Sequence, residues 1–199
     1  MRTRHLQLPL DDTVIRELRA GDPVLLSGRI VTGRDRAHRW LAEQRREALC
    51  PYLEEGAVYH CGPIMYRDKE TWQCRAAGPT TSLREEPYMA DILDAYRLRC
   101  IIGKGGMGER TATALSQCAA VYLHAVGGAA VHYAEKVTQV EDVFMLKEFG
   151  MPEALWVLQV KALPLIVSMD TVGNSLHRDI LKASQERLPG IVEKLDRRY

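Results

Sequence analysis

The chain has 199 residues, of which 46% are hydrophobic and 27% charged, and its 27 basic and 26 acidic side chains leave a formal net charge of +1. This composition is typical of a soluble globular protein, and the small net charge argues against a nucleic-acid-binding or polyanion-binding surface. No segment has the apolar core of a signal peptide or the length of a membrane span, so we expect a cytoplasmic protein that does not bind membranes.

The first part of the chain carries patterns of a strand, a helix and a hairpin. Val, Ile and Thr residues predict a strand that ends near Thr32, and Gly28 marks a bend or bulge within it. Apolar residues then recur at three- and four-residue steps, which predicts a helix over residues 35–50 with Asp35 as its N-cap. The next predicted elements are a short strand over 57–61, a hairpin turn at 67–69 and a returning strand over 72–77.

The remainder of the chain alternates between helix and strand patterns. Ser82 and Glu85 match a capping box, and Pro87 suits an early position in a helix that ends near Arg97 or Leu98. The other predicted elements are strands over 100–102 and 119–126, a helix over 111–118, strand-rich segments over 137–149, 155–161 and 165–169, and a terminal helix interrupted near residues 189–190. Such alternation implies a partly parallel sheet. We therefore predict an α/β fold with a mixed sheet in a single domain, residues 1–199, with 174–199 as a C-terminal helical segment.

Two glycine-bearing loops are the most informative feature of the sequence: GPTTSLR at 78–84 and GKGGMG at 103–108. Each follows a predicted strand and precedes a predicted helix, whose N-terminus offers free N–H groups and a partial positive charge. Arg84 and Lys104 add a cation to each loop. Two such loops predict a ligand with more than one negative group, either a dicarboxylate or a phosphate compound.

The second loop also fits other interpretations. Its glycines match the GxGxxG pattern of dinucleotide-binding proteins, but residues 123–130 lack the acidic residue that would hold a ribose. It does not supply the Gly-Lys-Ser/Thr of a P-loop. A tight turn without any ligand remains an alternative, and Lys104 favours an anion site over it.

Three consecutive hydroxyl side chains, Thr80, Thr81 and Ser82, precede Arg84. Helix capping would explain one or two of them. A hydroxyl can accept a proton only if nearby cations or a metal lower its pKa, and Arg84 with Lys104 would act in that direction. Capping and catalysis both remain open for this segment.

The segment GRDRAH at 33–38 is dense in ionisable groups. Arg34 could bind a carboxylate in a bidentate fork, or the segment could be a capped and solvated helix start. We favour a surface position for His38 over an acid/base role. The remaining internal histidines show no ligand spacing, and we predict structural roles for His60, His124, His132 and His177.

The five cysteines, at positions 50, 61, 74, 100 and 118, form neither a CxxC pair nor a Cys/His ligand spacing. A zinc or iron–sulfur site built by this chain alone is therefore not expected. We predict reduced thiols that are mostly buried.

Six segments together carry a resemblance to a known family. They are GRDRAH (33–38), GPI (62–64), GPTTSLR (78–84), IGKGGMG (102–108), MPEALW (151–156) and IVSMDTVGN (166–174). In this order, over about residues 5–195, they resemble the β subunit, or C-terminal domain, of the iron–sulfur hydro-lyases class I fumarate hydratase and L(+)-tartrate dehydratase.

The resemblance implies a swivelling β/β/α domain and an active site divided between two polypeptides. The partner α subunit would ligate a 4Fe–4S cluster whose open iron binds the substrate hydroxyl and a carboxylate as a Lewis acid. The implied activity, present only with the α subunit, is reversible hydration of a four-carbon dicarboxylate, with fumarate to (S)-malate favoured and L(+)-tartrate dehydration as the alternative. A dimer of heterodimers is the expected assembly. A non-catalytic anion-binding regulatory module and a purely structural assembly subunit remain alternatives of other classes.

The resemblance also implies a role for individual residues. Thr80 would be the base that removes the proton next to a carboxylate. Arg34, Arg84 and Lys104 would bind the substrate carboxylates and offset charge in a carbanion-like transition state.

Three further residues would support these groups. Asp35 and Thr81 would orient the substrate-binding side chains, and Gly105 would let the backbone approach the ligand. Members of the family commonly carry Met after the arginine of the Thr-Thr-Ser motif, where this chain has Glu85. We expect that difference to affect local packing rather than chemistry.

Overall fold

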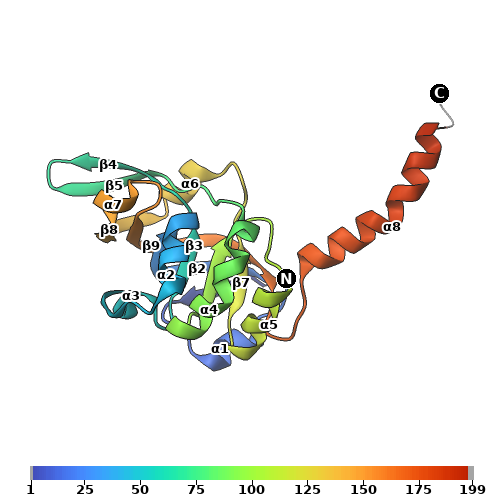
Figure 1. Cartoon of the computed structure of the whole chain (residues 1–199), viewed down its shortest axis with the longest axis horizontal. Coiled ribbons are helices and arrows are strands. Elements are labelled where there is room, and N and C mark those ends of the chain that lie inside the picture. Colours follow the sequence, from blue (N-terminus) through green and yellow to red (C-terminus); the bar gives the residue numbers. More distant parts are fainter. Residues whose placement is uncertain (1, 197–199) are drawn as a thin grey trace.

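The computed structural model describes residues 2–196 and contains a seven-stranded mixed sheet with a separate two-stranded hairpin (Figure 1). The strands are β1 (Arg4–Gln7), β2 (Pro23–Gly33), β3 (Ala57–His60), β4 (Ile64–Asp68), β5 (Thr71–Ala76), β6 (Cys100–Gly103), β7 (Val121–His124), β8 (Val137–Phe144) and β9 (Leu155–Met169). The α-helices are α1 (Asp12–Glu17), α2 (Asp35–Glu43), α3 (Cys50–Leu53), α4 (Glu86–Tyr96), α5 (Glu109–Gln117), α6 (Ala130–Ala134), α7 (Leu146–Phe149) and α8 (Leu176–Asp196). Two short 3-10 helices are η1 (Glu47–Leu49) and η2 (Ser82–Glu85).

The sheet closes on itself through its longest strand. Strands β2, β3, β6 and β7 are parallel neighbours, and β9 pairs antiparallel with both β7 and β2. Because β9 has 15 residues, one end can pair with β7 while the rest follows β2. The result is a small five-stranded barrel, with β1 and β8 added outside the ring. The mixed α/β class predicted from sequence is therefore confirmed.

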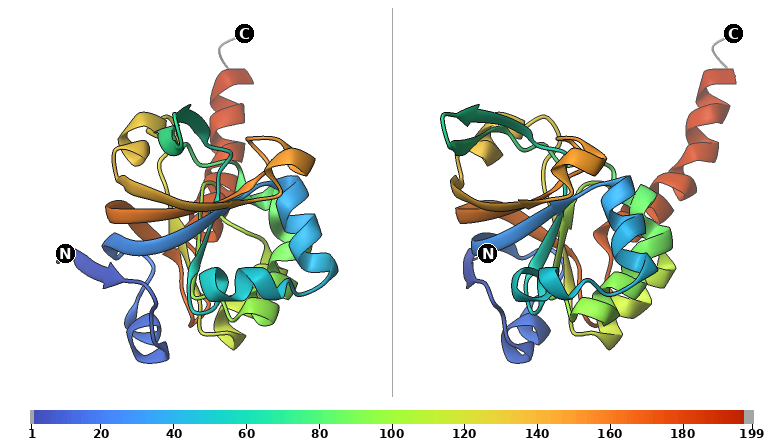
Figure 2. Two further views of the ribbon diagram at one scale, coloured as in Figure 1. Left: turned by 90° about the vertical axis from the view of Figure 1, so that its left-hand side faces the viewer. Right: turned by 60° about the vertical axis from the view of Figure 1, so that its left-hand side comes forward.

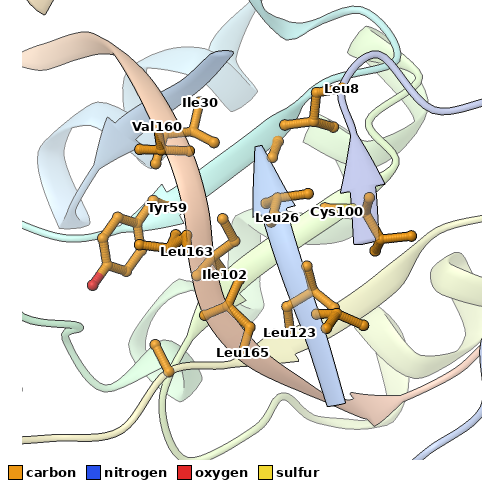
Figure 3. Packing of buried hydrophobic residues seen from close by; sticks show 14 of the residues in the cluster. Leu8, Leu26, Ile30, Tyr59, Cys100, Ile102, Leu123, Val160, Leu163 and Leu165 are labelled. Carbon is orange, nitrogen blue, oxygen red and sulfur yellow. The ribbon is translucent and has the colours of Figure 1, made fainter. Parts of the chain in front are cut away.

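Alternating side chains divide each barrel strand between two apolar cores. On β3, Ala57 and Tyr59 point into one core, and Val58 between them belongs to the other. Successive side chains of a strand face opposite sides, so a strand buried on both faces is almost entirely apolar. Figure 3 shows the first core, where Tyr59 lies near Leu163 and Ile102. The second core lies between the strands and helices α2, α4 and α5, which pack along one side of the barrel (Figure 2).

Several predicted elements have different limits in the structure. The helix predicted over 35–50 ends at Glu43 and is followed by η1 and α3. The two strands predicted over 155–161 and 165–169 form one continuous β9. A left-handed backbone at Ala162, with φ of 52°, lets the strand bend opposite the bulge at Gly28 without ending.

The C-terminal helix is continuous where the sequence predicts a break. Pro189 lies inside α8, and the predicted interruption at 189–190 does not end the helix. A proline removes one backbone hydrogen bond and can kink a helix without terminating it. Figure 1 shows α8 leaving the body of the molecule. The last three residues of the predicted segment, 197–199, lie outside the described part of the chain.

Candidate active site

The carboxyl ends of the four parallel barrel strands meet at one edge. Gly33 of β2 is in register with His60 of β3, and Gly103 of β6 is in register with His124 of β7. In α/β proteins, ligands bind outside the carboxyl ends of parallel strands. The segments that leave this edge carry the residues singled out by sequence, among them Arg34 directly after Gly33.

Backbone hydrogen bonds join the two glycine-bearing loops. Thr81 and Lys104 form an isolated parallel β-bridge, in which the Ser82 amide donates to the Lys104 carbonyl at 3.0 Å. The Lys104 amide in turn faces the Thr80 carbonyl at 3.4 Å, and the Thr80 amide donates to the His60 carbonyl at 2.7 Å. The structure therefore brings Thr80 and Lys104 together, as the sequence predicted for a shared site.

Gly103 lies tightly against Ser82 of the other loop. A Cβ at this position would lie 2.0 Å from Ser82 Oγ and 3.0 Å from the Tyr122 hydroxyl. These two hydroxyls share a hydrogen bond of 2.8 Å between buried side chains. Only glycine allows this approach, so Gly103 has a packing reason in addition to any effect on a ligand.

The capping box predicted for Ser82 and Glu85 is not formed. The segment begins with the 3-10 helix η2, whose N-cap is Thr81 without a side-chain cap bond. Ser82 uses its hydroxyl for Tyr122, and the Glu85 carboxyl is buried instead of reaching back to the backbone. Long-range packing has taken both side chains away from the local arrangement that their spacing suggests.

Arg34 and Arg84 share one carboxylate. Arg84 forms an ion pair with Asp35 Oδ2, and an Arg34 Nη atom lies 4.0 Å from the same oxygen. Arg34 Nε also lies 3.6 Å from a Glu153 carboxylate oxygen. Asp35 is the first helical residue, and the N-cap is Arg34, one position earlier than predicted. The arrangement gathers two guanidinium groups around one anionic position.

The side chains of Thr80 and Lys104 have no such commitments. Within the described residues, the Thr80 hydroxyl makes no hydrogen bond and the Lys104 ammonium makes no ion pair. Both residues are half-buried. The Lys104 Nζ atom lies near Gly127, 3.8 Å from the position that a Cβ would take there. A hydroxyl and an ammonium are thus available to a ligand beside the two arginines.

Gly105 and Thr81 lie at the exposed rim of this site. Gly105 has a φ of +83°, a left-handed conformation that glycine adopts without strain. A Cβ on Gly105 would approach Thr81 Cγ2 to 3.9 Å, which is an ordinary contact. Backbone conformation, rather than space, therefore requires glycine at position 105.

Three ionisable side chains that sequence reasoning did not place in the site lie fully buried behind it: His38, His60 and Glu85. His38 was predicted at the surface, and the structure contradicts this. Its Nδ1 atom lies 2.9 Å from the Arg34 carbonyl, and burial lowers the pKa of His38 to about 4. Burial also lowers the pKa of His60 and raises that of Glu85 to about 7. The sequence signal for this cluster was Glu85 itself, which departs from the methionine that the resemblance implies after the arginine of the Thr-Thr-Ser motif.

The described residues do not offer ligands for a metal cluster. No group of three or more His, Cys, Asp or Glu side chains among them is arranged to hold a metal ion. All five cysteines are free, and Cys50, Cys61 and Cys100 are buried, as predicted. Burial raises the pKa of Cys74 to about 11 and that of Cys100 to about 12, which keeps these thiols protonated, whereas metal ligands are thiolates. In the part of the chain that the structure describes, no helix combines the length and apolarity needed to cross a bilayer.

Comparisons with known proteins agree with this picture. The family model described as "Fumarase C-terminus" matches residues 2–180. A putative class I fumarate hydratase from Geobacillus stearothermophilus is 48% identical over 184 residues, which are 92% of this chain and 35% of that protein. The chain thus spans about a third of the length of this relative.

Two further relatives are of nearly the same length as this chain. A putative L(+)-tartrate dehydratase subunit beta from Methanocaldococcus jannaschii is 39% identical over 181 residues, covering 89% of this chain and 93% of that protein. The L(+)-tartrate dehydratase subunit beta of Escherichia coli K12 is 38% identical over 192 residues, covering 96% and 94%. Hydratases and dehydratases of this kind are hydro-lyases. The chain belongs to the Fumarase C-terminus family, and its named relatives are hydro-lyases.

Proposed function

We propose that this chain is the β subunit of a two-subunit iron–sulfur hydro-lyase that reversibly hydrates a four-carbon dicarboxylate, with fumarate to (S)-malate favoured. The observation that carries this proposal is the grouping of Arg34, Arg84, Lys104 and an uncommitted Thr80 hydroxyl at one edge of the barrel. Three cations suit a substrate with two carboxylates, and the hydroxyl suits proton transfer at a carbon beside one of them.

Each of these residues has a distinct role in the proposed reaction. Arg34 and Arg84 bind substrate carboxylates, since guanidinium groups match carboxylates in a bidentate geometry. Thr80 removes the proton from the carbon next to a carboxylate in the dehydration direction and returns it in hydration. Lys104 and the arginines lower the pKa of the Thr80 hydroxyl and offset the negative charge that develops on the substrate.

Asp35, Thr81 and Gly105 support this arrangement. Asp35 holds both guanidinium groups before substrate arrives, which lowers the entropy cost of ordering them. Thr81 fixes the relative position of the two loops through its bridge to Lys104. The left-handed backbone at Gly105 leaves the rim open to a ligand.

The cluster and the rest of the active site are proposed to come from a partner. Because the described residues of this chain do not fit a cluster, we assign its ligation to an α subunit, and the family expectation of a dimer of heterodimers applies. The relatives support this division: this chain corresponds to 35% of a fumarate hydratase but to 94% of a protein named subunit beta. We take the whole chain as one swivelling β/β/α domain with a C-terminal helical segment.

Helix α8 supplies the surface that we assign to the α subunit. It exposes large apolar side chains at a helical spacing that forms one stripe, namely Ile180, Leu181, Leu188, Ile191 and Val192. An apolar groove lined by Leu83, Gly105, Met107 and Leu181 connects this stripe with the site loops. Exposed apolar patches of this kind mark interaction surfaces. A partner that completes the active site next to Gly105 would also cover the stripe.

L(+)-tartrate is the second candidate substrate. It is favoured by the two tartrate dehydratase β subunits, which match this chain over 93% and 94% of their own lengths. Fumarate is favoured by the higher identity, 48% against 39% and 38%. The two substrates require the same carboxylate-binding groups, so Arg34, Arg84 and Lys104 serve either.

The test is anaerobic co-purification of this chain with its cluster-bearing partner, followed by turnover of fumarate and of L-tartrate. We expect activity only when both polypeptides are present, and loss of it in Thr80→Ala. An intact complex with a loaded cluster that turns over neither acid would contradict the proposal and favour a non-catalytic anion-binding module. Full activity of the partner alone would indicate a purely structural subunit.

A further inference from the structure

His38, His60 and Glu85, here called the buried triad, lie against one another behind the proposed substrate-binding residues. All three side chains are inaccessible to solvent. The His38 and His60 rings meet edge to face with centroids 4.6 Å apart, and Glu85 Oε2 lies 3.6 Å from His38 Nδ1. They come from α2, β3 and η2, so only the tertiary structure brings them together.

The buried triad is poorly supplied with hydrogen-bond partners. Both Glu85 oxygens, both His60 nitrogens and His38 Nε2 have none. The carbonyl of Arg34 can only accept, so His38 Nδ1, 2.9 Å away, carries a hydrogen. Burial lowers the pKa of His38 to about 4, so the ring is neutral near pH 7. A carboxylate in such surroundings would be an unpaired buried charge, which is strongly unfavourable. These surroundings therefore favour the neutral acid form of Glu85.

Each member of the buried triad is connected to a different substrate-binding residue. His38 bonds to the Arg34 carbonyl, the His60 carbonyl accepts the Thr80 amide at 2.7 Å, and Glu85 directly follows Arg84 in η2. The buried triad therefore borders the segments that carry Arg34, Thr80 and Arg84.

The charges around Glu85 determine what its ionisation would do. Burial is the main cause that raises the pKa of Glu85 to about 7; Arg84 opposes it, Glu153 adds to it and Arg34 opposes it. The two opposing groups are the guanidiniums proposed to bind the substrate. The remaining ionisable neighbours, His38 and His60, are held neutral by burial and so offer no positive charge.

We propose that Glu85 is a positioning residue whose neutral form adds no negative charge beside Arg34 and Arg84, and whose carboxylate form adds one that competes with the substrate for these two guanidiniums. This rests on the proposed function of the site. It makes the buried triad a regulator of substrate affinity: the chain binds a dicarboxylate well when Glu85 carries its proton and less well when it does not.

The proposal predicts a pH dependence of KM that a merely structural glutamate would not produce. In the complex with its partner, KM for the preferred dicarboxylate should rise by roughly tenfold between pH 6 and pH 9, with a smaller change in kcat. A tenfold rise corresponds to the loss of about one charge-assisted hydrogen bond between the chain and the substrate. In Glu85→Gln and Glu85→Met, which have no carboxylate, this rise should be absent.

Glu153→Gln is the matched control, because Glu153 also contacts Arg34 but through a partly exposed carboxylate. Glu153 favours the protonated form of Glu85, so its removal should move the rise in KM to lower pH without abolishing it. A rise that persists in Glu85→Gln and Glu85→Met, or a flat profile in the unaltered complex, would overturn the proposal.

A second readout separates this proposal from the proposed function. Infrared difference spectra of the complex, recorded without substrate, should contain a carboxylic-acid C=O band at pH 6 that is lost by pH 9 and is missing in Glu85→Gln. Absence of such a band in the unaltered complex would overturn the assignment of Glu85 as a neutral acid. Should the complex turn over neither fumarate nor L-tartrate, calorimetric affinities for these acids at the two pH values replace KM.

Discussion

Thr81 and Lys104 lie side by side in an isolated parallel β-bridge, although they belong to loops that follow different strands. The bridge ties the two loops to each other, because backbone groups of each bond to the other. Thr80, one residue before the bridge, is thereby held next to the Lys104 backbone. A hydroxyl that must meet a substrate carbon benefits from such fixed placement.

Removal of the Thr80 hydroxyl is expected to lower kcat of the complex strongly. Loss of one proton-transferring group commonly reduces the rate by about 10²–10⁴. Thr80→Ala should show this loss, whereas Thr80→Ser should retain part of the activity because it keeps an oxygen at the same carbon. Steady-state turnover of fumarate measures both. Equal activity of Thr80→Ala and the unaltered chain would remove Thr80 from the base role.

Loss of a guanidinium from the site should weaken substrate binding more than it slows chemistry. Arg34→Met is expected to raise KM by about 10–100-fold, since hydrogen bonds to charged groups contribute about 1.5–3 kcal/mol. Arg110→Met is the control, because Arg110 forms its ion pair with Asp91 at 2.5 Å on an exposed surface of α5. The two KM values decide the point: a similar change in both variants would show that Arg34 has no specific role in binding.

Gly103→Ala should disrupt the contact between the two glycine-bearing loops. The added methyl group would lie 2.0 Å from Ser82 Oγ, so Ser82 and the backbone around Lys104 must shift. We expect a lower melting temperature together with lower kcat. Gly127→Ala is the control in the same region, because its nearest contact would be an ordinary 3.5 Å from the Lys104 side chain. Melting curves in which Gly103→Ala is as stable as Gly127→Ala would contradict the packing argument.

Replacement of Glu85 by Met should change how stability depends on pH. The folded chain keeps the Glu85 proton up to about pH 7, whereas the unfolded chain loses it near the ordinary pKa of 4.5. The folded state thus binds more protons between these values, and its stability falls as pH rises through this window. Between pH 5 and pH 8 the unaltered chain should lose roughly 2–3 kcal/mol of unfolding free energy through this effect, and Glu85→Met should not. The free energy of unfolding of Glu85→Met minus that of the unaltered chain should therefore increase by this amount.

Denaturant unfolding at the two pH values measures this difference. Burial lowers the pKa of His38 to about 4, so His38 favours folding increasingly as pH rises from about 4 to its ordinary value of 6.5, which is the opposite direction. This contribution is common to both proteins and cancels in the comparison. A difference that stays constant with pH would show that Glu85 ionises normally.

The apolar stripe of α8 should be required for assembly with the partner. Introducing charge through Leu181→Glu and Leu188→Glu is expected to prevent co-purification with the cluster-bearing subunit, because both side chains are exposed members of the stripe. Lys182→Glu changes charge on the other face of the helix, as its spacing requires, and should leave the complex intact. Recovery of equal amounts of complex from all three variants would place the interface elsewhere.

The sequence by itself determined the features that depend on short-range preferences. The β4–β5 hairpin, the strands β3 and β6, and the two glycine-bearing loops between strand and helix follow from residue types that favour strands and turns over a few positions. The family was also evident from motifs such as GPTTSLR, because their order and spacing are specific even without a structure.

Tertiary structure alone decided which side chains are buried and what they contact. Closure of the barrel depends on β9 pairing with both β2 and β7, which no local pattern encodes. Packing of α2 and η2 against each other and the strand ends buries His38 and Glu85, although the arginines directly beside them in sequence, Arg39 and Arg84, are exposed. It also draws the Ser82 hydroxyl to Tyr122 in place of a helix cap. The physical reason is that burial and hydrogen-bond partners are set by contacts between distant segments, which overrule the preferences of the residues next to them in the chain.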